Sequence, residues 1–392
     1  MIGFNLTCKM LVLEAVVLAV VKPALALSAT SIAQGQPQAV VYSARIDSTT
    51  GRIFLKRPDW SNFRPVPVGT ELNQGDQIKP DKGVRVRVVC PNLSKPFVPI
   101  GVPSGLKTIC PIWQAIISKA PPPAGTLGGN NPLIPYLITP RHTLLLSSTP
   151  TFRWNAVPKA TQYTLTLLSP TGVVWQKQVK NNSLVYPGLA PLKSGTNYSL
   201  VIKTNTGKTS QNEGTSNLDF RVLRKSEVIA IQSEVTKITK SGLNEQVKAL
   251  MLANLYSRYT LPQDAIQAYG LTADTFKSYN LSADAIATLE TLVKQGKQST
   301  IIYRSLGDIY WQTGLAQKAV DNYLAAIKLA KSDEDLEEKI LAQFALGEVY
   351  AATDDNKQAI SWYSQAKDGY TLLGDTRRAN FLKQQIESLK QQ

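Results

Sequence analysis

The sequence predicts a multidomain protein in which two all-β regions precede an all-helical region made of repeated units. Short alternating apolar runs separated by turn residues fill the first half of the chain, and a Pro- and Gly-rich stretch divides them. Near the end of the chain, a set of small and aromatic residues recurs at a fixed displacement. With 392 residues the chain exceeds one ordinary core, so we expect roughly two to four domains.

Charge is distributed unevenly along the chain. The net charge is +15, but residues 1–225 contain 25 Lys and Arg against 8 Asp and Glu, whereas residues 226–392 contain 18 against 20. Between Asp81 and Glu213 there are 14 basic residues and no acidic one, so this segment lacks a carboxylate for acid–base catalysis or metal binding. Its charge predicts affinity for an anionic envelope polymer or a membrane surface. The alternative is that the charge only keeps the protein soluble.

Residues 1–29 have the pattern of an export signal peptide. Lys9 precedes an apolar run from Leu11 to Val21, and alanines follow where a signal peptidase could cut. The run is too short to span a bilayer as a helix. We therefore expect a cleaved signal, a mature chain without a transmembrane segment, and location in the periplasm or cell envelope. The alternative is an uncleaved anchor or a buried helix.

Two cysteines, Cys90 and Cys110, would remain after signal cleavage. In an oxidising compartment we expect a disulfide between them, which would stabilise the domain by about 3 kcal/mol. Two buried free thiols are the alternative. The chain has one histidine, His142, and neither this residue nor the cysteine pair forms a zinc pattern. We expect His142 to be exposed and without a catalytic role.

A first β-region is expected over residues 39–113. The segment Val84–Val88 alternates valine with arginine, which is typical of a strand with one buried face. An apolar strand, Trp60, Gly69, the pair Gly75-Asp76 and a second apolar strand follow one another in an order that resembles the FecR-like β-domain. The resemblance implies a β-domain located in the periplasm. It also implies an envelope sensor or regulatory protein as one functional alternative.

A second β-region follows a linker. Residues 114–139 are rich in Pro and Gly and predict a spacer without chemistry. Residues 140–224 contain β-branched and aromatic runs separated by turn residues, as in an antiparallel sandwich. The segment Pro150–Pro158, together with Gly195–Tyr198, resembles a fibronectin type III-like domain. The resemblance implies core positions for three aromatic residues: Trp154, Tyr163 and Tyr198.

Residues 226–392 have the composition and the apolar periodicity of helices. Six positions recur at a displacement of 40 residues: Leu306, Gly307, Tyr310, Ala319, Tyr323 and Ala326 return as Leu346, Gly347, Tyr350, Ala359, Tyr363 and Ala366. This set resembles the tetratricopeptide (TPR) signature, whose usual period is about 34 residues. A weaker copy runs from Leu252 to Tyr269, and residues 377–390 predict a capping helix. The resemblance implies a TPR-like solenoid of about three hairpins.

The TPR resemblance implies a packing role for all twelve signature residues. Gly307 and Ala319 are expected where the helices of one hairpin touch, and Tyr310 and Tyr323 between that hairpin and its neighbours. In this family the first helix of each hairpin lines a groove for a peptide or a partner helix. The register assigns five residues to that groove: Tyr303, Asp308, Gln312, Gln343 and Glu348.

The sequence contains no nucleophile elbow, phosphate loop, dinucleotide fingerprint or histidine-containing metal motif. We therefore expect no enzyme activity, no cofactor and no metal site, and export disfavours a nucleic-acid partner. The leading hypothesis is a non-enzymatic exported envelope scaffold that binds a protein partner through the TPR-like repeats. The alternatives are a binding module for an anionic glycan or envelope polymer, carried by the basic β-regions, and the sensor role implied by the FecR resemblance.

Overall fold

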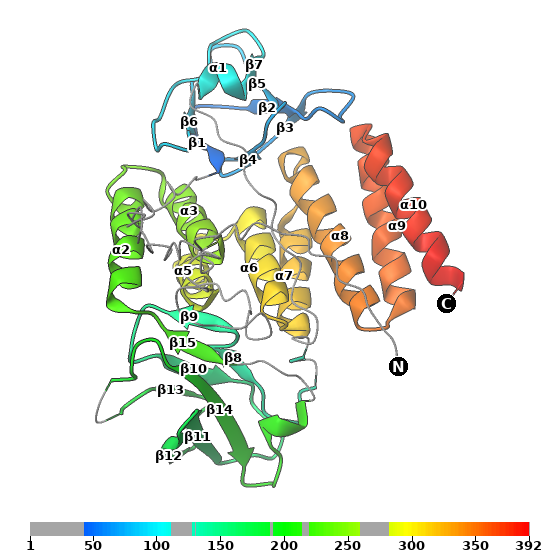
Figure 1. Cartoon of the computed structure of the whole chain (residues 1–392). Coiled ribbons are helices and arrows are strands. Elements are labelled where there is room, and N and C mark those ends of the chain that lie inside the picture. Colours follow the sequence, from blue (N-terminus) through cyan, green and yellow to red (C-terminus); the bar gives the residue numbers. More distant parts are fainter. Residues whose placement is uncertain are drawn as a thin grey trace, which may run out of the picture. The chain divides into compact units, whose positions relative to one another are not determined.

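The predicted order of two β-domains and a helical domain is confirmed by the computed structural model (Figure 1). Contacts gather residues 40–392 into one compact unit. The expected signal segment and two positions of the weaker repeat copy, Ala265 and Tyr269, lie outside the described part of the chain. The structure describes the following residues: 43–110, 128–129, 131–188, 191–213, 219–258 and 282–391.

Two small antiparallel sheets form the first domain. Their strand orders are β4-β1-β6 and β3-β2-β5-β7. The elements are β1 (Ala44–Thr49), β2 (Ile53–Lys56), β3 (Arg64–Pro65), β4 (Glu71–Leu72), β5 (Gln77–Pro80), β6 (Val86–Val89), β7 (Ser104–Gly105) and the short helix α1 (Leu106–Ile109).

The alternation of valine and arginine places one face of β6 in the core of this domain. Val86 and Val88 are fully buried, whereas Arg85 is exposed and Arg87 half-buried. Gly69 has a φ of 91°, a conformation that favours glycine, at the turn that returns the chain to β4. A disulfide joins Cys90, just after β6, to Cys110, just after α1, with the two Cα atoms 5.6 Å apart.

The second domain is a sandwich of two antiparallel sheets. One sheet has the order β13-β10-β8, and the other has the order β12-β11-β14-β15-β9, in which β9 pairs in parallel with β15. The strands are β8 (Leu137–Thr139), β9 (Thr143–Leu145), β10 (Thr151–Trp154), β11 (Tyr163–Ser169), β12 (Gly172–Val179), β13 (Ser183–Val185), β14 (Asn197–Thr204) and β15 (Phe220–Val222), and the 3-10 helix η1 (Ser210–Glu213) follows β14.

Aromatic residues fill the sandwich core. Trp154 and Tyr163 are buried and meet edge to face, with ring centroids 5.6 Å apart. The buried hydroxyl of Tyr198 accepts a hydrogen bond from the backbone N–H of Lys193 at 2.8 Å. This contact resembles the tyrosine corner of immunoglobulin-like sandwiches, in which a tyrosine hydroxyl bonds to the backbone a few residues upstream.

The expected spacer over residues 114–139 is wrong at its C-terminal end. Leu137–Thr139 forms β8, which pairs with β10, so the sandwich begins before residue 140. Ile134 and Tyr136 are also buried. Proline and glycine at the start of this stretch obscured a short strand whose burial depends on a partner later in the chain.

His142 is buried, with 3% of its surface accessible, so its expected exposure is wrong. It follows Arg141, which is also buried, in the tight connection between β8 and β9. The Nη1 atom of Arg141 pairs with Glu213 Oε1 at 2.9 Å, and its Nε atom donates to the backbone oxygen of Thr313. The sequence of Arg141 and His142 suggests a surface turn, but the sandwich and the helices together bury both residues.

The helical domain completes the chain. Ser299 caps α6 by accepting a hydrogen bond from the N–H of Ile302, and Gly374, with a φ of 80°, ends α9. The helices are α2 (Lys225–Thr239), α3 (Glu245–Arg258), α5 (Ser282–Lys294), α6 (Thr300–Gln312), α7 (Ala316–Leu329), α8 (Leu336–Ala352), α9 (Asn356–Leu373) and α10 (Thr376–Gln391), with the 3-10 helix η3 (Asp333–Asp335) before α8.

Candidate partner-binding surface on the helical repeats

Two hairpins, α6–α7 and α8–α9, are built around a glycine that faces a tyrosine. A Cβ atom added to Gly307 would lie 2.5 Å from Cδ1 of Tyr323, and one added to Gly347 would lie 2.3 Å from Cδ1 of Tyr363. Real Cβ contacts this short do not occur, so each glycine is required for the ring to lie flat on the helix. The displacement of 40 residues therefore reflects a repeated helix–helix contact.

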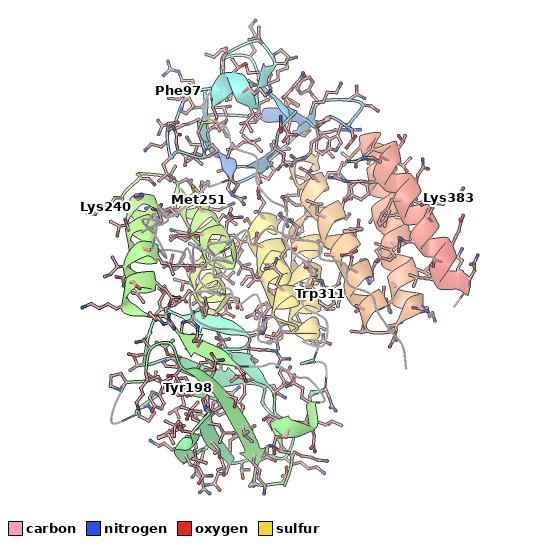
Figure 2. The ribbon with its side chains drawn as sticks, viewed as in Figure 1. Phe97, Tyr198, Lys240, Met251, Trp311 and Lys383 are labelled. Carbon is pink, nitrogen blue, oxygen red and sulfur yellow. A yellow bond between two sulfur atoms is a disulfide. The ribbon has the colours of Figure 1, made fainter. Side chains whose placement is uncertain are left out.

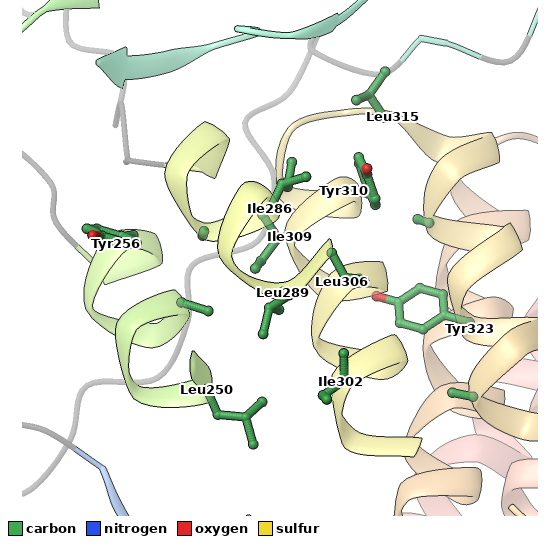
Figure 3. Packing of buried hydrophobic residues seen from close by; sticks show 14 of the residues in the cluster. Leu250, Tyr256, Ile286, Leu289, Ile302, Leu306, Ile309, Tyr310, Leu315 and Tyr323 are labelled. Carbon is green, nitrogen blue, oxygen red and sulfur yellow. The ribbon is translucent and has the colours of Figure 1, made fainter. Parts of the chain in front are cut away.

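The signature residues form the interior of the two hairpins. Leu306, Leu346 and the signature alanines are at most 2% exposed, and Tyr350 alone among the twelve is only half-buried. The hydrophobic signature residues of α6 and α7 belong, with Leu346, to a cluster that continues into α3 and α5, where Leu250, Tyr256 and Leu289 join it (Figure 3). The signature residues of α9 belong to a second cluster, which includes residues of α10. Each hairpin therefore buries its faces against its neighbours, as in other repeat proteins.

The two tyrosines of the first hairpin have different neighbours. Tyr310 reaches the preceding helix, where its hydroxyl donates to Glu290 Oε1 at 2.6 Å, as expected for a residue between hairpins. Tyr323 was expected between hairpins but packs on Gly307 within its own hairpin, and its hydroxyl donates to Asp308 Oδ1 at 3.0 Å. Figure 3 shows its ring extending from α7 toward α6. Because Gly307 has no side chain, the ring of Tyr323 can pack directly against α6 at this position.

A network of charges connects the two hairpins. Arg304 on α6 pairs with Asp308 one turn later at 2.7 Å and with Glu338 at the start of α8. The two carboxylates raise the pKa of Arg304, against the opposing effect of its burial. Burial, reinforced by the negative charge of Asp308, also raises the pKa of Tyr323 well above its ordinary value. Both shifts favour a charged guanidinium on Arg304 and a protonated phenol on Tyr323 at neutral pH.

The five residues assigned to the groove have different surroundings. Gln343 is 6% exposed and donates to Gln365 Oε1 at 3.2 Å, so its assignment to an open groove is wrong. Asp308 belongs to the charge network, and Tyr303 packs against the repeat core. Gln312 is half-buried, and Glu348 is exposed. Tyr303 and Asp308 are five residues apart on α6, about 140° around the helix, so register does not place the pair on one face. The packing of neighbouring helices then decides which side reaches solvent.

Two residues that sequence reasoning missed lie on the same helix faces. Arg304 is one turn before Asp308 on α6, and Phe344 is one turn before Glu348 on α8, again at a displacement of 40. Phe344 is half-buried, with its ring centroid 6.0 Å from that of Tyr363. The period itself was the signal that could have found both. We define the α6–α8 face as Arg304, Asp308, Gln312, Phe344 and Glu348.

The first β-domain contacts the helices through an arginine that pairs with two acids. Arg57 pairs with Asp76 of its own domain at 2.6 Å and, through two nitrogens, with Glu337 at the start of α8. Burial raises the pKa of Asp76 to about 6, although Arg57 acts in the opposite direction. Trp60 is 3% exposed in a cluster with Tyr370 and other residues of α9 and α10. These contacts attach the first domain to the ends of several helices.

The sandwich contacts the helices through two arginines. The Nε atom of Arg141 donates to the backbone oxygen of Thr313 at the end of α6, and Arg153 on β10 pairs with Glu290 on α5 at 2.6 Å. Within the expected spacer, Gly128 accepts from Ala316 and donates to the backbone oxygen of Gly314 at 2.9 Å. These two backbone hydrogen bonds attach this part of the expected spacer to the connection between α6 and α7. None of these contacts between the β-domains and the helices uses a residue of the α6–α8 face.

Residues 298–371, which span both hairpins, match the tetratricopeptide repeat family. No curated protein matches the chain. Two solved structures resemble it with 16% identity: BtubC (BKLC) from P. vanneervenii, with a TM-score of 0.29 over 42% of this chain and 65% of that one, and the FN1–FN3 domains of chicken CNTN1, with a TM-score of 0.15 over 43% and 51%. The chain thus spans less than two thirds of either structure. Among the described residues, no helix is long and apolar enough to cross a membrane. The α6–α8 face lies within the segment that matches the tetratricopeptide repeat family, a module that generally mediates protein–protein interaction.

Proposed function

We propose that this protein is an exported, non-enzymatic scaffold that binds a partner protein on the α6–α8 face. The observation that carries the proposal is the pair of stacked hairpins that match the tetratricopeptide family. Their small and aromatic signature residues are mostly buried in the packing of the helices. Recognition of a partner would therefore depend on residues on the outer faces of α6 and α8. The two β-domains would hold these helices in place through contacts at their ends.

The chemistry of the α6–α8 face indicates the kind of partner. Glu348 is exposed, and the charge network beside it has two carboxylates against one guanidinium, which leaves a net negative charge. Phe344 adds an aromatic surface one turn away. We therefore infer a basic peptide or helix with at least one apolar residue as the bound segment.

Export rests on two supporting features. The N-terminal pattern of Lys9 and an apolar run is that of a signal peptide. The disulfide between Cys90 and Cys110 is typical of proteins in oxidising compartments. N-terminal sequencing of the protein from a periplasmic or envelope fraction tests this part, and an uncleaved chain in the cytosolic fraction would refute it.

The binding proposal is tested by affinity capture from an envelope extract, followed by quantification of each captured protein. Glu348→Lys reverses a charge on the proposed face, and Asp368→Lys makes the same change on α9, where the carboxylate is also exposed. We expect Glu348→Lys to reduce capture of the partner at least tenfold and Asp368→Lys to leave it within twofold. Equal capture by both variants, or loss with both, would refute the assignment of this face.

A second function is favoured by the lysines of the sandwich. Six of them are exposed and form no ion pair with any described residue: Lys159, Lys177, Lys180, Lys193, Lys203 and Lys208. They support the alternative of an anionic glycan or envelope polymer as ligand. Binding of the chain to such a polymer should then weaken steeply as salt rises, and no binding at low salt would exclude it.

A further inference from the structure

We propose that the loop of residues 96–103 in the first domain inserts into the interfacial region of an anionic lipid bilayer. Three of the eleven large apolar side chains that are exposed in the described part of the chain lie within this loop: Phe97 at 58%, Ile100 at 58% and Val102 at 54%. Figure 2 marks Phe97 at the periphery of its domain. Such a concentration of exposed apolar side chains marks an interaction surface. The inference does not depend on partner binding by the repeats.

Several contacts hold the base of the loop against its domain while these three side chains are exposed. Its base is fastened by backbone hydrogen bonds from Val98 to Val86 at 2.9 Å and from Val88 to Pro96 at 3.1 Å. The disulfide between Cys90 and Cys110 closes the segment that carries the loop. Prolines at positions 96, 99 and 103 restrict the backbone further. Val98, between the exposed residues, is buried and anchors the loop.

The charge around the loop indicates an anionic surface. Residues 82–110 contain five basic residues and no acidic one. Lys82, Arg85 and Lys107 are exposed, and the guanidinium of Arg87 lies over the ring of Phe97, 5.1 Å from its centroid. An apolar tip with a cationic margin matches a bilayer, where apolar groups enter the acyl boundary and cations meet anionic headgroups. Each exposed cation near such a surface strengthens binding about fivefold.

A bilayer suits the loop better than a folded protein. The apolar residues project from a short loop that is interrupted by prolines and by Gly101, around which there is open space. A protein partner would require a matching groove, whereas the bilayer interface adapts to the loop and hydrates its polar backbone groups. A soluble protein or a soluble polyanion as the true ligand is an outcome that the experiment distinguishes.

The test is cosedimentation of residues 40–392, the compact unit defined by the contacts, with vesicles of phosphatidylcholine alone or mixed with phosphatidylglycerol. We expect binding to the anionic vesicles, and at least tenfold weaker binding when the three loop residues are changed to serine (F97S/I100S/V102S). The matched control, Leu133→Ser/Val173→Ser/Val174→Ser, removes three exposed apolar side chains from the sandwich and should bind within twofold of the unchanged protein. Lys82→Glu/Lys107→Glu should also weaken binding, whereas Lys177→Glu/Lys180→Glu should not.

Three results would overturn the proposal: no preference for anionic vesicles, equal binding by the loop triple variant, or equal losses in the loop and control variants. A single change, Ile100→Ser, provides a milder test if the triple variant misfolds, because this side chain is largely exposed. A soluble sulfated dextran separates charge from insertion. The loop triple variant should bind it normally, since its cations are intact, and a parallel loss there would refute insertion.

Discussion

Substitution of Gly347 by alanine is a direct test of the packing that defines the repeats. The new Cβ atom would lie 2.3 Å from Cδ1 and 2.4 Å from Cε1 of Tyr363, which is 5% exposed and cannot swing into solvent without opening the hairpin. Alanine gains about 1 kcal/mol in helix propensity over glycine. Overpacking of a buried ring costs about 3 kcal/mol at the upper end of its usual range, so we expect a net loss of about 2 kcal/mol.

Hydrogen exchange followed by mass spectrometry measures this loss locally, because a multidomain chain does not unfold in two states. Amides of α8 and α9 should exchange about 30-fold faster in Gly347→Ala, the equivalent of about 2 kcal/mol. Ser388→Ala, at an exposed position of α10, is the matched control and should change exchange little. Combining Gly347→Ala with Tyr363→Leu should restore part of the loss. Slower exchange in Gly347→Ala would show that propensity, not contact with the ring, governs this position.

Three further predictions concern the contacts that hold the domains. Replacing Cys90 and Cys110 by serine should speed amide exchange in the first domain by the equivalent of about 3 kcal/mol, and unchanged exchange would contradict a closed disulfide. Arg57→Met leaves two buried carboxylates without their cation. It should lower the local stability at the start of α8 by about 3 kcal/mol and so speed amide exchange there. Arg52→Met, which removes the arginine of an exposed pair, should leave exchange unchanged. Burial raises the pKa of Asp284 from 3.8 to about 6, so its ionised form costs stability above about pH 6 and not below about pH 4. Asp284→Asn should therefore be more stable by about 1–3 kcal/mol at pH 8, and the advantage should vanish at low pH; a constant difference would refute the assignment.

Much of the fold could be predicted because its signals are local or periodic. Valine alternates with arginine around Val86 and Val88, and successive side chains of a strand point to opposite faces. The pattern therefore predicts that the valine face is buried, and both valines are fully buried in the structure. The recurrence of Gly307 as Gly347 required a repeated close contact, whatever the neighbouring helices were. These features are carried by residues that meet within one strand or one hairpin.

The candidate site was less predictable because it depends on partners from other elements. Gln343 and Glu348 are five residues apart, about 140° around one helix, so they do not share a face. Gln343 is buried against α9, whereas Glu348 is exposed, and only the packing of α9 shows which of the two sides is covered. Asp308 is drawn into a network by Arg304, and nothing in a single helix shows that Glu338 completes it. Register defines a helix face, whereas accessibility depends on what packs against that face.

The sequence by itself determined the order of the domains, the repeat period and the residues whose small size lets helices meet, since these follow from local patterns and from recurrence. Only the tertiary structure decided that Arg141 meets Glu213, that Arg57 meets Glu337, and that the end of the expected spacer is a strand. These pairings join residues far apart in the chain. Burying a charged or backbone polar group costs free energy unless a partner pairs with it, and no local pattern encodes which distant residue supplies that partner.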